Sequence, residues 1–363
     1  GGAAIRAAVE RAGVQPDAVG EVLFGNCLMA GQGQAPARQA AFKGGLPKEA
    51  GAVTLSKMCG SGMKAAMFAH DMLLAGTHDV MVAGGMESMT NAPYLLQKGR
   101  GGYRLGHDRI FDHMMLDGLE DAYEPGRSMG TFGEDCAAKY GFTRAEQDAF
   151  ATASVERAKA ATASGAFAAE ITPVTVKSRA GETVVSVDEG PGKVKLDKIA
   201  SLKPAFKKDG TITAASSSSI NDGAAALVMM RASTATKLGC KPLARIVGHA
   251  THAQEPEWFA TAPLGATQKA LAKAGWAVGD VDLWEINEAF AVVPMALMKE
   301  LNLPHDKVNV NGGACALGHP IGASGARIMV TLIYALQARG LKKGLATLCI
   351  GGGEATAVAV ELV

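Results

Sequence analysis

A cysteine lies in a short Gly/Ser turn directly before a stretch that is typical of a helix, in TLSKMCGSGMKAA (54–66). The apolar run after Gly62 places Cys59 just before that helix or in its first turn. Because a helix N-terminus favours the thiolate, we expect the pKa of Cys59 to lie about one unit or more below the usual ~8.5. Cys59 is therefore a candidate nucleophile, although most cysteines are small buried hydrophobic residues.

A second Gly/Ser turn, NGGACALGHPIGASGARI (311–328), carries a histidine just before another helical stretch. If the two helices begin side by side, Cys59 and His319 face the same space. An imidazole that takes a thiol proton activates the sulfur for covalent acyl transfer. A histidine before a proline can also be a simple turn residue, but the joint pattern favours catalysis.

Two further residues follow predicted strands. Cys349 ends a buried strand in TLCIGGGEA, where Gly351 and its neighbours leave backbone N–H groups free to bind an oxyanion. Packing alone would also explain Cys349. Asn287, in WEINEAFA, is either the N-cap of the next helix or a group that holds a water or a substrate oxygen.

The elements that carry these residues occur twice along the chain. An amphipathic helix, an Ala-Gly end, a short turn and a β-rich run are found in both 3–26 and 266–290. The Gly/Ser turn and apolar helix of 59–76 match 322–340, and the buried strand of 79–85 matches 345–353. Three aligned blocks in one order indicate a duplicated β/α unit with a mixed, largely parallel sheet that is covered on both faces.

The duplication divides the chain into three parts: an N-terminal half (1–90, continued by 211–240), an insertion (91–210) and a C-terminal half (241–363). The insertion is richer in charge and loops, and it contains a helix that we expect to begin with a capping box of Thr143 and Glu146. The run TITAASSSSINDGAAA (211–226) is either a flexible linker or a Ser/Gly stretch that suits a pantetheine tunnel or a phosphate contact.

Composition narrows the classes of function. A formal net charge of +1 over 363 residues gives no general attraction for nucleic acid or a membrane surface. No apolar run reaches the roughly 18 residues of a transmembrane helix. The six scattered cysteines favour a reducing, cytoplasmic location. The chain begins inside a helical pattern, so we expect the natural protein to begin earlier, which leaves organelle targeting open.

No metal site is expected from the pattern of the other histidines and cysteines. HExxH, Walker and GxGxxG signatures are absent from the sequence. The cysteines without an obvious partner are Cys27, Cys136, Cys240 and Cys315. The histidines in ordinary helix, loop or insertion contexts are His70, His78, His107, His113, His249, His252 and His305.

Together these motifs resemble those of the thiolase family. The nucleophile turn (54–66), VAGGMESMTNAPYLL (82–96), NEAFA (287–291), NGGACALGHPIGASGAR (311–327) and CIGGGEATA (349–357) follow the family order over essentially the whole chain. The resemblance implies the thiolase fold, two α/β/α/β/α halves with mixed sheets plus an inserted loop domain, which agrees with the duplication.

The resemblance also implies roles. Cys59 would carry the acyl group as a thioester, His319 would activate it, and Cys349 would be the general acid/base at the α-carbon. Asn287, through a water, and His319 would form one oxyanion hole, and the backbone N–H groups of Cys59 and Gly351 the other. The matching coenzyme A positions are Leu119, Met129, Phe206, Ala214, Ser218 and Phe290. Coenzyme A and acyl-CoA would be substrates, with no further cofactor.

Two departures from the family pattern affect the substrate subtype. Ser128 stands where many biosynthetic members have a histidine, and the run Ala214–Ser219 replaces an Ala-Gly-Asn-Ala-Ser-Gly sequence. The leading prediction is an acetyl-CoA C-acetyltransferase that forms homodimers or homotetramers. The alternatives are a 3-ketoacyl-CoA thiolase of β-oxidation with broader chain length, a non-catalytic acyl-CoA-binding relative, and a cysteine hydrolase that uses Cys59 and His319.

Overall fold

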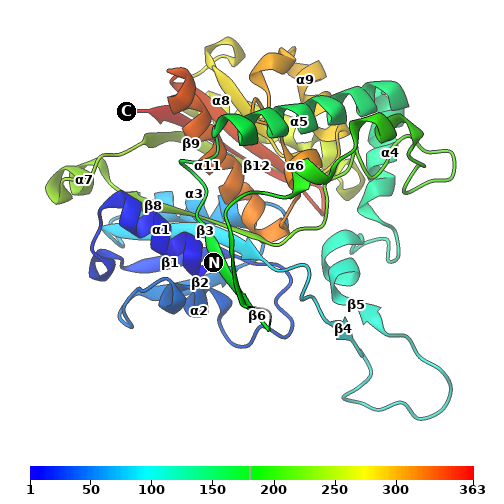
Figure 1. The fold of residues 1–363 in the computed structure, drawn as a ribbon, viewed down its shortest axis with the longest axis horizontal. Helices are drawn as coiled ribbons and strands as arrows, with labels where there is room; N and C mark the ends of the chain where they lie inside the picture. The colour runs from blue at the N-terminus through cyan, green and yellow to red at the C-terminus, as the bar shows by residue number, and fades with distance from the viewer. Residues whose placement is uncertain (180) are drawn as a thin grey trace.

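The computed structural model describes residues 1–179 and 181–363 and contains two four-stranded sheets with two helices packed between them. Further helices cover the outer face of each sheet, which gives five layers in the order α/β/α/β/α (Figure 1). The predicted fold class is confirmed. Each half of the chain supplies one sheet, one outer helical layer and one of the two central helices.

The first sheet has the order β2-β1-β3-β8. Strands β1 and β2 pair in parallel, as do β1 and β3, whereas β8 is antiparallel to β3. Helices α1 and α2 pack on the outer side of this sheet. The bounds are α1 (Gly2–Ala12), β1 (Glu21–Gly25), α2 (Pro36–Lys43), β2 (Gly51–Leu55), β3 (Val80–Glu87) and β8 (Gly223–Met230).

The second sheet has the order β10-β11-β12-β9. Strands β10, β11 and β12 pair first in parallel and then antiparallel, as β1, β3 and β8 do in the first sheet, and β9 adds a second antiparallel pair. This repetition agrees with the duplicated blocks of the sequence. Helix α8 covers its outer side, and α9 packs against α8. The bounds are β9 (Ala244–Ala253), α8 (Ala262–Ala274), β10 (Leu283–Ile286), α9 (Val292–Leu301), β11 (Lys343–Ile350) and β12 (Glu354–Leu362).

The central helices α3 (Ser61–Leu74) and α11 (Ile321–Arg339) meet at their first turns through glycines. A methyl group at Gly62 would lie 2.9 Å from the Ala326 backbone nitrogen, and one at Gly325 would lie 2.4 Å from that of Met63. By length and composition α11 could cross a membrane, but 72% of its apolar window is buried inside the protein. Its apolar surface therefore serves the contact with both sheets.

The segment 91–210 crosses from the first sheet to the second, with α4 and α5 lying beside the second sheet and a β4–β5 loop projecting away (Figure 1). Helix α5 begins with the predicted capping box of Thr143 and Glu146. Ala180 belongs to the predicted insertion and lies outside the described residues. The elements are β4 (Tyr94–Leu95), β5 (Phe111–Asp112), a π-helical turn (Met115–Leu119), α4 (Met129–Tyr140), α5 (Arg144–Ser164), β6 (Val174–Ser178), β7 (Gly181–Val185), α6 (Gly190–Lys193) and a 3-10 helix (Leu196–Ser201).

Short elements complete the chain between the larger ones. They are the helices α7 (Ala232–Leu238) and α10 (Ala314–Leu317) and the 3-10 helices Pro16–Ala18, Pro256–Thr261, Val278–Asp280 and His305–Lys307.

The close approach of α11 to the first sheet gives a test of the packing. A methyl group at Gly85 in β3 would lie 2.0 Å from the Gly322 carbonyl oxygen. We expect Gly85→Ala to lower the free energy of unfolding by about 1–3 kcal/mol, because backbone must move to relieve the clash. The matched control is Gly279→Ala, where nothing lies within 4 Å of the added methyl. Equal urea midpoints for the two variants would contradict this packing.

Candidate active site

The turn that carries Cys59 is held in a strained shape by side-chain hydrogen bonds. Met58, the residue before the cysteine, has a φ of 45°, in the left-handed region that non-glycine residues seldom adopt. The Ser61 hydroxyl donates to the Met58 carbonyl at 2.6 Å and accepts from the Lys57 backbone N–H at 2.8 Å. These bonds fix Cys59 immediately before the N-cap of α3, where the sequence predicts it.

Cys59 is a neutral thiol at physiological pH. Burial raises its pKa to about 11, although hydrogen bonds from the backbone N–H groups of Gly351 and of Cys59 itself lower it. The prediction that the helix N-terminus lowers this pKa is therefore wrong, because desolvation of the charged form outweighs the favourable dipole. A nucleophilic role requires a base that removes the proton when the substrate is bound.

His319 lies just before α11 and is 7% exposed. Its Nδ1 is 2.5 Å from the Ser324 hydroxyl, which lies 3.1 Å from the Pro320 carbonyl oxygen. If the hydroxyl donates to that carbonyl, it accepts from Nδ1–H, and the lone pair of the imidazole is then on Nε2. Among the described residues Nε2 has no hydrogen-bond partner although it is buried. The free nitrogen of His319 is thus the basic one.

The protonation state of His319 suits a base. Burial lowers its pKa to about 4, and the charge of Arg327 lowers it further in the same direction. The imidazole is therefore neutral at physiological pH. Together with the raised pKa of Cys59, this gives a resting pair of neutral thiol and neutral imidazole, with no ion pair before substrate binds.

Cys349 lies one residue before the end of β11 and is fully buried. Burial raises its pKa far above the usual range, and the charge of Cys59 raises it further. A methyl group at Gly60 would meet the Ile350 side chain, so the turn of Cys59 lies against the end of β11 that carries Cys349. A thiol with so high a pKa holds its proton until a strong base forms beside it.

Asn287 directly follows β10, and its backbone N–H donates to the Thr347 carbonyl at 3.1 Å. The residue is 1% exposed, and both polar atoms of its side chain are buried without a partner among the residues that the structure describes. Helix α9 begins at Val292 after Ala291 as N-cap, so Asn287 is not an N-cap. A buried amide without protein partners is suited to a bound water or ligand oxygen.

The Ser-rich run 211–226 connects two parts of the site. The Ser218 backbone N–H donates to the Ala289 carbonyl at 3.0 Å, and the Ser219 carbonyl accepts from the His319 backbone N–H at 3.1 Å. The run therefore joins the loop after Asn287 to the loop that carries His319, and the interpretation as a flexible linker is wrong.

Four of the predicted coenzyme A positions lie around this region. A methyl group at Gly351 would lie 3.6 Å from the terminal carbon of Met129. The rings of Phe206 and Phe290 are 5.6 Å apart in an edge-to-face arrangement. Leu119 packs against the same apolar cluster as Cys59.

The other two predicted positions lie on the Ser-rich run. Ala214 is exposed and Ser218 is half-buried. Ser128, the departure from the family pattern, is the N-cap of α4, with its hydroxyl accepting from the Gly130 backbone N–H at 3.4 Å.

Sequence reasoning missed Glu87, which joins the two halves of the site. Its carboxylate accepts from the backbone N–H groups of Cys27 at 3.1 Å, Leu28 at 3.0 Å and Gly322 at 2.8 Å. Burial raises its pKa, although these hydrogen bonds lower it. The bond to Gly322 fixes the first turn of α11 beside β3. An acidic residue inside the apolar run VAGGMES was the available signal.

A second missed carboxylate is Glu288. It accepts from the Ser154 hydroxyl at 2.7 Å, from the Asn309 side-chain amide at 2.7 Å and from the Cys315 backbone N–H at 2.9 Å. These bonds hold the loop that leads to His319. The glutamate within NEAFA, between apolar residues, was the available signal.

The expectation that the remaining cysteines have no obvious partners is wrong at Cys27. The Cys27 thiol lies 3.3 Å from both the Met58 carbonyl and the Ser61 hydroxyl, within the nucleophile turn. His70 and His249 contact each other. His70 follows Cys59 by about 16 Å along the axis of α3, so this contact is separate from the site.

Comparison with known proteins matches both halves of the chain to the same protein family. The family model described as Thiolase, N-terminal domain, matches residues 1–233, and that described as Thiolase, C-terminal domain, matches residues 240–362. An acetyl-CoA acetyltransferase of Chromobacterium violaceum is 52% identical over 99% of this chain and 92% of its own length. Acetyl-CoA acetyltransferase 2 of Arabidopsis thaliana is 50% identical over 100% of this chain and 90% of its own length.

Solved structures agree with these relatives. The acetyl-CoA acetyltransferase of Bacillus anthracis superimposes with a TM-score of 0.96 at 43% identity, over 99% of this chain and 91% of the other. A thiolase of Ascaris suum in complex with coenzyme A superimposes with a TM-score of 0.93 at 40% identity, over 100% of this chain and 93% of the other.

The raised pKa of Cys59 gives a measurable pH dependence. Alkylation requires the thiolate, and a pKa of about 11 leaves little of it near neutral pH. We therefore expect the rate at which iodoacetamide modifies Cys59 in the free protein to rise continuously up to about pH 11. Peptide mass spectrometry at a series of pH values measures this rate. A plateau reached below pH 8 would instead indicate a thiolate–imidazolium pair.

Proposed function

The chain belongs to the thiolase family, and from this premise we propose that it is an acetyl-CoA C-acetyltransferase. It condenses two molecules of acetyl-CoA to acetoacetyl-CoA and coenzyme A, and it catalyses the reverse thiolysis. The observation that carries the proposal is the packing of the Cys59 turn against the end of β11, where a methyl group at Gly60 would meet Ile350 beside the buried thiol of Cys349. One sulfur is the nucleophile and the other is the acid/base.

The first half-reaction loads Cys59. Nε2 of His319 takes the thiol proton while the sulfur attacks the thioester carbonyl of acetyl-CoA. The backbone N–H groups of Cys59 and Gly351, which bind the sulfur in the free enzyme, hold the oxyanion as it forms. Cys349 gives its proton to the departing sulfur of coenzyme A. The products are free coenzyme A, acetylated Cys59, an imidazolium and a Cys349 thiolate.

The second half-reaction forms the carbon–carbon bond. The Cys349 thiolate removes an α-proton from a second acetyl-CoA, and the enolate oxygen is held by the Nε2–H of His319 and by a water on Asn287. The enolate carbon attacks the acetyl group on Cys59, and the departing Cys59 sulfur takes the proton from His319. Every group returns to its starting protonation state, so the cycle balances without a further cofactor.

The remaining assignments complete the proposal. Coenzyme A lies along Met129, Phe206, Phe290 and the Ser-rich run, and residues 91–210 form the loop domain that covers it. The aromatic edge-to-face pair and the backbone bonds of the run support this position. The protein acts as a homo-oligomer in the cytoplasm.

One observation favours a second candidate, a 3-ketoacyl-CoA thiolase with broad chain length. Ser128 is smaller than histidine and is occupied in capping α4. The space that a histidine would fill is then available to a longer acyl chain. A cysteine hydrolase would leave Cys349 without a role, and a non-catalytic relative would not need the full set of catalytic groups.

Chain length separates the two candidates. We expect coenzyme A-dependent cleavage of acetoacetyl-CoA to exceed that of longer 3-ketoacyl-CoA substrates by about tenfold or more in kcat/KM, a difference of about 1.4 kcal/mol. Cleavage rates measured from the four-carbon substrate upward provide the comparison. Comparable rates on six- to ten-carbon substrates would move the assignment to the broad thiolase.

Two conservative variants separate the two sulfur roles. We expect Cys59→Ser to lose nearly all transfer, because a serine hydroxyl is a far weaker nucleophile without stronger activation. We expect Cys349→Ser still to accept an acetyl group from acetyl-CoA on Cys59, more slowly because the coenzyme A sulfur then leaves without its proton donor, and to lose condensation by about 10²–10⁴-fold. Radiolabel transfer and acetoacetyl-CoA formation are measured in parallel. Near-normal thiolysis by Cys59→Ser, or unchanged condensation by Cys349→Ser, would contradict the assignment.

A further inference from the structure

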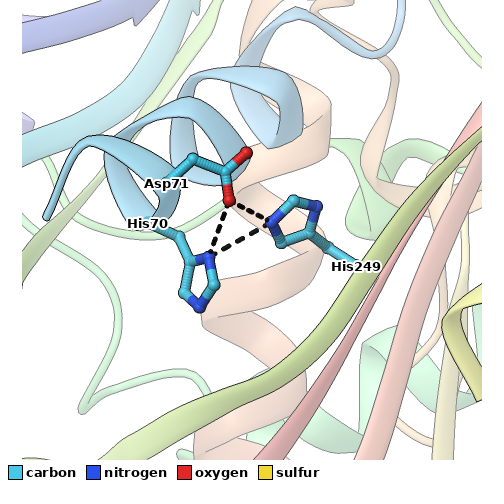
Figure 2. A group of neighbouring side chains, drawn as sticks. All are labelled: His70, Asp71 and His249. Carbon is cyan, nitrogen blue, oxygen red and sulfur yellow. Dashed lines mark hydrogen bonds and ion pairs between the residues drawn. The ribbon is translucent and has the colours of Figure 1, made fainter. Parts of the chain in front are cut away.

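Three side chains of types that commonly bind metal ions lie together between the two halves of the molecule. His70 and Asp71 are in the second half of α3, and His249 is in β9 of the other sheet (Figure 2). Sequence reasoning did not connect these residues, because 179 positions separate His70 from His249. The catalytic cycle proposed above uses none of them.

Three potential ligand atoms converge on one point. Nε2 of His249 lies 2.9 Å from Oδ1 of Asp71 and 3.2 Å from Nδ1 of His70, and the latter is 3.1 Å from Oδ1 (Figure 2). The edges of this triangle are nearly equal. Tetrahedral zinc at about 2.0–2.1 Å from each ligand requires ligand separations of about 3.3–3.4 Å, so the three atoms would move apart by a few tenths of an ångström. One face of a zinc coordination sphere is therefore already formed, with only small shifts needed.

The surroundings leave room for further ligands. The exposed fractions of the side chains are 24% for His70, 57% for Asp71 and 12% for His249. The ring of His249 is thus anchored inside, whereas the carboxylate faces solvent. An ion bound to the three atoms would complete its shell with water from the open side.

A simple hydrogen-bonded cluster accounts less well for the same geometry. Each imidazole can donate one hydrogen to Asp71, but the contact of 3.2 Å between the two ring nitrogens is then not a hydrogen bond. A metal ion satisfies all three atoms with the imidazoles neutral. Burial lowers the pKa of His249, although Asp71 raises it. The charge of Lys273 acts on His249 and opposes a cation, so we expect moderate affinity.

We propose that His70, Asp71 and His249 bind a divalent cation of the zinc class, which bridges α3 to β9. Two imidazole nitrogens and one carboxylate oxygen suit zinc and its neighbours in the first transition row, whereas magnesium and calcium prefer oxygen ligands alone. Helix α3 begins two residues after Cys59. The ion would therefore link the helix that follows the proposed nucleophile to β9 of the opposite sheet.

Zinc binding to the full-length chain tests the proposal. Equilibrium dialysis with zinc chloride should give about one more zinc per chain in the wild type than in Asp71→Asn or His249→Asn. Because Asp71 is largely exposed, its variant should fold normally. The matched control is His78→Asn, which removes a histidine paired with Glu21 at 2.9 Å and should bind as the wild type does. Any zinc that binds at cysteines is present in equal amount in the wild type and the three variants, because none of the substitutions changes a cysteine.

Thermal unfolding gives an independent readout, because an ion that binds only the folded state raises Tm. We expect zinc to raise the Tm of the wild type and of His78→Asn, EDTA to reverse the shift, and Asp71→Asn to show none. Equal zinc content in wild type and Asp71→Asn, or stabilisation by magnesium in place of zinc, would overturn the proposal.

Discussion

The contact between the first turns of α3 and α11 is the constraint on which the site depends. Only glycine permits it, since a methyl group at Gly62 or Gly325 would meet the backbone of the opposite helix within 3 Å. The turns before these helices carry Cys59 and His319, the proposed nucleophile and the proposed base, so the close approach sets the two turns side by side. The Glu87 carboxylate reinforces the contact through the Gly322 N–H.

The same packing determines the chemistry. Two sheets enclose the central helices, and the resulting burial keeps Cys59 a thiol and His319 a neutral imidazole. In the proposed reaction charge appears in the site only as the reaction proceeds, and it would meet the Gly351 N–H and the Asn287 amide, which has no partner among the described residues. A dry site with fixed donors stabilises developing charge more strongly than water does.

The sequence predicted the features that depend on local patterns. The duplicated blocks indicated two matching sheets, and the Gly/Ser turns placed Cys59 and His319 at helix starts. The sequence did not predict properties that depend on residues far apart along the chain. Burial reversed the expected direction of the shift in the Cys59 pKa. The carboxylate of Glu87 accepts a hydrogen bond from Gly322, which lies 235 positions further along the chain. Local periodicity carries no information about such pairs, because the fold alone brings them together.

The central claim is that Cys59 alone carries the acyl group. The most direct measurement is peptide mapping of the wild-type protein after it is mixed with acetyl-CoA and quenched in acid, which preserves thioesters. The account predicts one acetyl group on the peptide that contains Cys59 and none on the peptides of Cys27, Cys315 or Cys349. Acetylation of Cys349 in place of Cys59, or an unmodified protein that still forms acetoacetyl-CoA, would contradict it.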